Sequence, residues 1–180
     1  MQQAQQENKM GVMPVNRLII TMSLPMIVSM LVTALYNVVD SIFVARIGEK
    51  ALTAVSLSFP IQNLMIAIST GTGVGINALL SMNLGRKDFK AVGKVASNGL
   101  FLAACSSLLF IVFGFFFTPF FFKSQTSDLE IIQYGCDYLK ICSIFCFGLF
   151  LQITNDRILQ ATGKTIYTMF TQGTGAIINI

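Results

Sequence analysis

Residues 95–122 decide the fold: they read VASNGLFLAACSSLLFIVFGFFFTPFFF and contain no charged side chain. About 20 apolar residues in a helix are enough to cross the roughly 30 Å hydrocarbon core of a bilayer. A membrane strand needs only about 10 residues and alternates apolar with polar positions, which this run does not do. The run therefore predicts a membrane-spanning helix.

Comparable runs lie on both sides of it. Residues 18–45 contain one charge, Asp40, and residues 51–84, 141–155 and 165–180 contain none. We therefore expect an all-α membrane protein, a bundle of long transmembrane helices with four complete spans and the beginning of a fifth. After a flexible tail at 1–13, the bundle occupies 14–180, with spans at about 14–47, 50–84, 89–122, 128–162 and 165–180.

The composition of the chain agrees with a membrane protein. Of 180 residues, 54% are hydrophobic and 11% are charged, whereas a soluble domain carries about a quarter charged residues. The chain has no histidine, which excludes Ser-His-Asp catalysis and zinc sites built on imidazole. No nucleophile, base and metal set converges in the sequence, so we expect neither an enzyme nor an organic cofactor.

Basic residues of the short loops predict the orientation, because Lys and Arg gather on the cytoplasmic side. With the amino terminus inside, eight fall on that side and three outside; the eight are Lys9, Arg17, Arg86, Lys87, Lys90, Lys94, Arg157 and Lys164. We expect a multi-pass protein of the cell membrane with a cytoplasmic amino terminus. The cluster at 85–94 sets this topology or touches anionic lipid head groups; it lacks the interleaved aromatics of a nucleic-acid surface.

Polar residues in the first apolar run follow helical spacing: Ser29, Thr33, Tyr36, Asn37 and Asp40 step by three or four and share one face. Lipid offers them no partners, so this face is expected to meet protein or a water-filled cavity. A carboxylate at that depth costs at least about 2.5 kcal/mol, which makes Asp40 a functional candidate. The alternative is a buried acid that serves packing alone.

Other spans add candidates. Pro25 removes a backbone hydrogen bond and marks a bending point or a static kink, and Gln62 and Asn63 are candidates for a cavity wall. Asp156 is either part of an interfacial charge cluster with Arg157 or a second internal acid; the sequence leaves both open. Gly71 and Gly75 have the GxxxG spacing that lets helices approach closely. At the start of the fourth span, Ser127 and Glu130 have capping-box spacing.

Several motifs together resemble one family over nearly all of residues 14–180. They are Leu24-Pro25, YNVVDSIF at 36–43, SFPIQ at 58–62, LQATG at 159–163 and GAIINI at 175–180. As a set they resemble the multidrug and toxic compound extrusion (MATE) transporters. The resemblance implies twelve helices in two six-helix lobes, of which this chain is most of the amino-terminal one and lacks the carboxy-terminal half. It also implies export of small organic, often cationic compounds in exchange for Na+ or H+.

The resemblance also implies roles for single residues. Asp40 matches the acid of the family's amino-terminal cation site, Tyr36 the tyrosine one turn earlier, and Pro25 the bending proline. Tyr138 and Asn179 match polar positions around that site, so Na+ would be held by Asp40 and Asn179. Asp156 stands where the family usually has a neutral polar residue, which leaves the choice between Na+ and H+ open.

Thr33, Asn37, Gln62 and Asn63 join Tyr36 and Tyr138 as expected walls of the substrate cavity. Two other functions stay open. One is a flippase for lipid-linked saccharides, which needs a cavity rich in basic residues that these segments lack. The other is a channel or a structural membrane subunit, which would show no gradient-driven accumulation of substrate.

Overall fold

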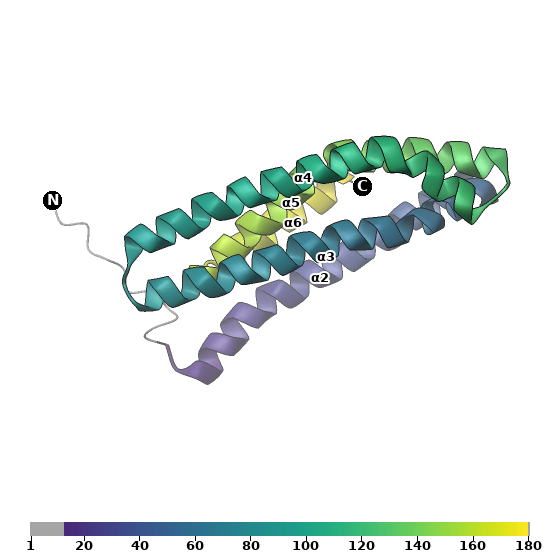
Figure 1. Ribbon diagram of the computed structural model, residues 1–180. Helices are drawn as coiled ribbons and strands as arrows, with labels where there is room; N and C mark the ends of the chain where they lie inside the picture. The colour runs from purple at the N-terminus through teal and green to yellow at the C-terminus, as the bar shows by residue number, and fades with distance from the viewer. Residues whose placement is uncertain (1–12, 180) are drawn as a thin grey trace.

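The computed structural model describes residues 13–179, and within this range the chain is all helical (Figure 1). This confirms the predicted fold class. The expected tail at 1–13 lies, except for Met13, outside the described residues. The helices, under the labels of Figure 1, are α2 Val15–Ile47, α3 Glu49–Gly85, α4 Phe89–Gln125, α5 Leu129–Ala161 and α6 Thr165–Asn179.

Four of these helices, α2 to α5, are long and apolar enough to cross a membrane. They contain 33 to 37 residues, which at 1.5 Å per residue gives about 50 to 55 Å. Because the hydrocarbon core is only about 30 Å thick, the ends of these helices reach past it. Helix α6 has 15 residues in the described range and is correspondingly shorter.

Short connections make successive helices antiparallel, as in a helical bundle. Gly48 joins α2 to α3 with φ 150° and ψ 162°, a backbone conformation that is essentially restricted to glycine. Helix α5 packs against α3 and α4, whereas α2 packs mainly beside α6 and makes fewer contacts with α3. Helices α2 and α6 therefore run in the same direction at the border of the α3–α4–α5 group (Figure 1).

Close approach at glycines holds α4 and α5 together. A Cβ on Gly135 would lie 2.1 Å from the ring of Phe122, whose side chain is 0% exposed. Gly114 faces Ser143 in the same manner. Small residues thus let large rings and hydroxyls fill the space between the two helices, which is how membrane helices pack.

The predicted close helix contact at Gly71 and Gly75 is wrong, because the glycine between them makes the contact. Gly71 and Gly75 are exposed, and nothing in the described structure lies within 4 Å of a Cβ built on either. Gly73, between them, faces α5 instead, where a Cβ would lie 2.9 Å from Cγ of Arg157. The prediction that glycines of this segment let a neighbouring helix approach is correct. The spacing alone does not say which side of α3 faces that helix, and the neighbouring helix lies on the side of Gly73.

Candidate functional site

Polar side chains of α3 and α5 meet toward the end of the bundle at which Asp40 of α2 lies. Gln62 of α3 donates from Nε2 to the Tyr138 hydroxyl oxygen at 3.0 Å and to Sγ of Cys142 at 3.7 Å, both on α5. Asp40 lies seven residues before the end of α2, and Tyr138 lies nine residues after the start of the antiparallel α5, so both lie toward the same end of the bundle. Two of the predicted site residues, Gln62 and Tyr138, are therefore in contact, and Asp40 lies toward the same end of the bundle.

The remaining residues of the α2 stripe become more exposed toward Asp40. Ser29 is buried, Thr33 and Tyr36 are half-buried, and Asn37 and Asp40 are exposed. The part of α6 that the structure describes packs beside α2 but reaches only part of the way along it. Its 15 residues cover about 22 Å, whereas Asp40 lies about 38 Å along α2 from the shared starting end.

Two other α2 and α3 candidates occupy the rim of this region. Asn37 shares the exposed face with Asp40, and the Ser41 hydroxyl donates to the Asn37 carbonyl at 2.8 Å. Asn63 follows Gln62 on α3 and is exposed. Pro25 lies inside α2, which continues through it, and the carbonyl of Pro25 accepts from the hydroxyl of Ser29 at 3.0 Å.

Asp156 is separate from this region. It is 18 residues beyond Tyr138, which places it about 27 Å farther along α5. A common site that includes both Asp40 and Asp156 is therefore not formed within the described chain, because each acid lies near the end of its helix and α2 and α5 run in opposite directions.

The surroundings of Asp156 favour one of the two sequence interpretations. Its side chain is only 7% exposed, and Oδ2 accepts a hydrogen bond from Nε2 of Gln172 on α6 at 3.0 Å. Arg157 turns elsewhere and donates to Oε1 of Gln160 at 3.0 Å. Asp156 is thus an internal acid between α5 and α6 rather than half of an exposed ion pair.

Asn179, the other residue expected to hold Na+, is the last residue of α6. Its side chain lies outside the described part of the structure. Among the described residues, no three His, Cys, Asp or Glu side chains form a group that could hold a metal ion. A Na+ site near Asp40 would consequently need carbonyl, amide or hydroxyl oxygens beside the carboxylate.

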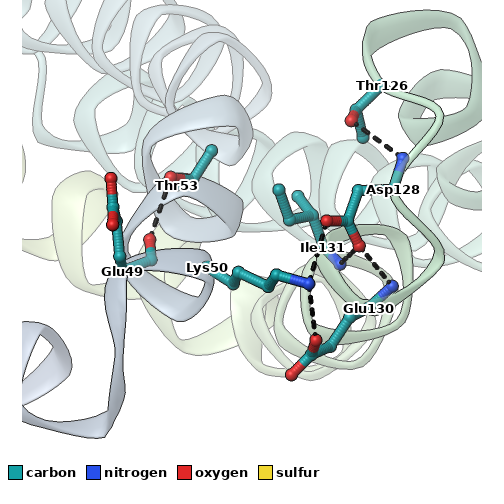
Figure 2. A network of polar contacts seen from close by, with 7 residues as sticks. All are labelled: Glu49, Lys50, Thr53, Thr126, Asp128, Glu130 and Ile131. Atoms are coloured by element: carbon teal, nitrogen blue, oxygen red, sulfur yellow. Dashed lines mark hydrogen bonds and ion pairs between the residues drawn. The ribbon is translucent and has the colours of Figure 1, made fainter.

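A cluster that the sequence analysis did not predict joins the start of α3 to the start of α5 (Figure 2). Nζ of Lys50 lies 3.0 Å from Asp128 and 2.7 Å from Glu130. The Lys50 hydrogen bond holds the pKa of the Asp128 carboxyl below its usual value. The sequence contains a signal for this contact: Lys50 is opposite in charge to Asp128 and Glu130, and the two loops that carry them are expected on the same side of the membrane.

Asp128 also begins α5, which corrects the predicted capping box. Its Oδ1 accepts from the backbone N–H of Glu130 at 2.9 Å and of Ile131 at 3.4 Å. The N-cap is therefore Asp128 and not Ser127, and Glu130 is used by Lys50. Aspartate is as favourable an N-cap as serine, so residue type alone did not distinguish the two.

Comparison with known proteins agrees with this arrangement. The MatE family profile matches residues 25–180. The chain is 27% identical over 93% of its length to the FAD transporter of Shewanella oneidensis and 27% identical over 88% to the multidrug export protein MepA of Staphylococcus haemolyticus. It covers 37% and 35% of these relatives, so it spans about a third of their length.

A solved structure shows the same fold. The structure, titled "Reverse polarity of binding pocket suggests different function of a MOP superfamily transporter from Pyrococcus furiosus Vc1 (DSM3638)", has a TM-score of 0.85 and 26% identity over 89% of this chain and 35% of its own. The profile match covers most of the chain, and the fold agrees with it. This chain therefore belongs to the MatE family, the multidrug and toxic compound extrusion family that its motifs resemble.

Proposed function

We propose that this chain provides most of the amino-terminal lobe of an antiporter that exports organic, often cationic compounds in exchange for Na+ or H+. The observation that carries the proposal is the acid Asp40 inside the membrane-spanning helix α2, at the end of the bundle where Gln62 of α3 donates to Tyr138 of α5. An acid inside the membrane costs free energy, so its presence there points to a role in binding or transport. Its chemistry also suits the exchange of one positive charge for another.

In this proposal the coupling ion and the substrate compete for the region around Asp40. A proton or Na+ neutralises the carboxylate, and an organic cation replaces it, so the acid is never left without a compensating charge. Polar groups at Thr33, Tyr36 and Asn37 extend the same α2 face and would orient the cation. Asn63 and Tyr138 would contribute the opposite wall.

Movement between inward-open and outward-open states requires two bodies that rock against each other. The chain spans about a third of its relatives, so we assign the second body to the carboxy-terminal half of the same transporter. Pro25 would supply a bending point in α2, because a proline lacks the backbone hydrogen bond that stiffens a helix. We place the assembly in the cell membrane with the amino terminus in the cytoplasm.

Asp156 takes a separate part in this proposal. It is a second proton- or cation-binding group about 27 Å along α5 from Tyr138, and Gln172 donates to it from α6. A charge on Asp156 strengthens that hydrogen bond, since bonds to ionised acceptors are the stronger ones. Ion binding at Asp156 would therefore alter the contact between α5 and α6 without touching the Asp40 site directly.

The direct test uses the protein encoded by the complete open reading frame that contains these residues. This protein is purified and reconstituted in proteoliposomes. The probe is tetraphenylphosphonium, a permanent organic cation, and the driving force is an imposed Na+ or pH gradient. We expect gradient-dependent accumulation of the probe and a reciprocal flux of one coupling ion. Equilibration without accumulation under both gradients contradicts the antiporter and favours a channel or a structural subunit.

A second candidate function is export of FAD, an anionic dinucleotide. The similarity of this chain to the FAD transporter of Shewanella oneidensis supports it. Lys140 is half-buried on α5, two residues after Tyr138, and it is a basic group that can attract a phosphate. Replacing tetraphenylphosphonium with FAD in the same vesicles distinguishes the two candidates. Accumulation of FAD that depends on Lys140, without transport of the organic cation, would support flavin export and refute the first proposal.

A further inference from the structure

One face of α4 is exposed along the helix and changes in chemical character from one end to the other. Its residues follow one another at steps of three or four, so they share one side of the helix. This outer face consists of Lys90, Lys94, Ser97, Phe101, Cys105, Leu108 and Val112, all exposed. The buried residues of α4, such as Gly99 and Ala103, lie on the opposite side, and α4 packs against α3 and α5.

We propose that the outer face of α4 binds an anionic phospholipid, with the head group at the two lysines and the acyl chains along the apolar residues. The order of groups along the face matches the order within such a lipid. Two ammonium groups come first, the hydroxyl of Ser97 follows, and large apolar side chains come last. Of these, Phe101 is 72% exposed and Leu108 is 62% exposed. This surface is separate from the region around Asp40, and its role does not depend on the proposed transport.

The position of the two lysines along α4 suits a lipid head group. Residues 95–122 contain no charge, and as a helix they are about 42 Å long. The hydrocarbon core is about 30 Å thick, and the bilayer with its head groups is about 40 to 45 Å thick. Lys94 immediately precedes the uncharged run and Lys90 lies one turn farther out, so both ammonium groups reach the head-group layer. Lysine stems can also lie along apolar surface while the charge stays in water.

The charges at this end of α4 favour an anion. Four exposed basic residues occur within nine positions: Arg86, Lys87, Lys90 and Lys94. The one acid among them, Asp88, caps the helix by accepting from the backbone N–H of Ala91 at 3.0 Å. In the described part of the chain the ion pairs belong to Lys50, and neither lysine of the outer face takes part in one. Like charges four positions apart on a helix repel each other, so a phosphate between the two lysines stabilises both.

A lipid fits the outer face better than a second protein does. Lysine and serine are depleted at protein interfaces, and here they make up the first turns of the face. From Phe101 to Val112 the Cys105 thiol is the one polar group of the face, and a thiol is a weak donor and acceptor. A protein partner would therefore find little to recognise by hydrogen bonding, whereas acyl chains need only apolar surface.

The experiment measures which lipid lies beside Cys105, which is exposed on the outer face between Phe101 and Leu108. The protein encoded by the complete open reading frame, with its other cysteines replaced by alanine, carries a bimane fluorophore on Cys105. It is reconstituted in vesicles of phosphatidylcholine and phosphatidylglycerol. Bromine on the acyl chains of one lipid quenches the fluorophore on contact. Comparing brominated phosphatidylglycerol with brominated phosphatidylcholine gives the ratio of their association constants at this position.

Three double variants separate the charge of the lysines from other effects. Lys90→Gln with Lys94→Gln removes both charges, and Lys90→Arg with Lys94→Arg keeps them. The matched control is Arg46→Gln with Lys123→Gln, which removes two exposed charges near the ends of α2 and α4, at the other end of the bundle. Lys94→Gln alone is the mildest change. Circular dichroism verifies that each variant is folded.

We expect the unchanged protein to prefer phosphatidylglycerol about 25-fold at low salt, because each basic group near an anionic lipid contributes a factor of about five. Lys94→Gln should lower this preference about fivefold, and the double glutamine variant should abolish it. The double arginine variant and the control should keep it. The preference should fall as the salt concentration rises.

Several results would overturn the inference. Equal quenching by the two brominated lipids would mean that the face does not select an anionic head group. No quenching by either lipid would mean that protein covers the face. A preference that survives in the double glutamine variant, or that is lost equally in the control, would mean that these lysines do not hold the head group. A preference removed by inorganic phosphate, but not by sodium chloride at equal ionic strength, would indicate a site for free phosphate.

Discussion

Replacing Gly135 with alanine tests the packing that positions the candidate site, because Gly135 lies one turn before Tyr138 on α5. The added Cβ would lie 2.1, 2.3 and 2.7 Å from three atoms of the Phe122 ring. The ring is fully buried and has no space to turn into. Overpacking of a filled core costs about 1 to 3 kcal/mol, and three simultaneous clashes place this site near 3.

The matched control is Gly148→Ala on the same helix. There, nothing lies within 4 Å of the new Cβ in the described structure, and alanine gains about 1 kcal/mol over glycine inside a helix. After this gain is subtracted, Gly135→Ala should lower the free energy of unfolding by about 2 kcal/mol, whereas Gly148→Ala should raise it by about 1. Denaturant unfolding in mixed micelles, followed by circular dichroism, measures both. Equal effects of the two substitutions would refute the close α4–α5 packing.

Two further predictions concern the charged groups. Gln172→Met removes the donor to Asp156 and should lower the free energy of unfolding by about 1.5 to 3 kcal/mol, the range for hydrogen bonds to charged groups; an unchanged unfolding curve would contradict the α5–α6 contact. Lys50→Met should return the pKa of Asp128 toward its ordinary 3.8, as followed by NMR titration of the carboxyl carbon. In the unchanged protein the Lys50 contact stabilises the fold above pH 3.8 and is lost as the pH falls through the lowered pKa of Asp128. A carboxyl titration that is the same with and without Lys50 would contradict this.

The sequence predicts the helices well because the signal is local. An uncharged apolar run of more than 20 residues is long enough to cross the membrane as a helix, so residues 95–122 alone determine most of α4. The polar stripe that contains Asp40 follows from the helical period in the same way. Neither inference depends on where the other helices lie.

Contacts between helices depend on information that local patterns lack. Gln62 and Tyr138 are 76 residues apart, and nothing in either segment states that the two side chains meet. The GxxxG pair identified the correct helix and the wrong face, since Gly73 makes the contact. The sequence leaves two interpretations of Asp156 open. The contact that decides between them comes from Gln172, on the helix that follows α5.

The substitution Asp40→Asn tests the central claim most directly. Asparagine keeps the size of the side chain and removes its charge, so the protein should still insert and reach the same level in the membrane. In proteoliposomes with an imposed Na+ or pH gradient, we expect the variant to lose gradient-driven accumulation of tetraphenylphosphonium. Full accumulation by Asp40→Asn at an equal protein level would contradict the claim that this acid exchanges the coupling ion for the substrate.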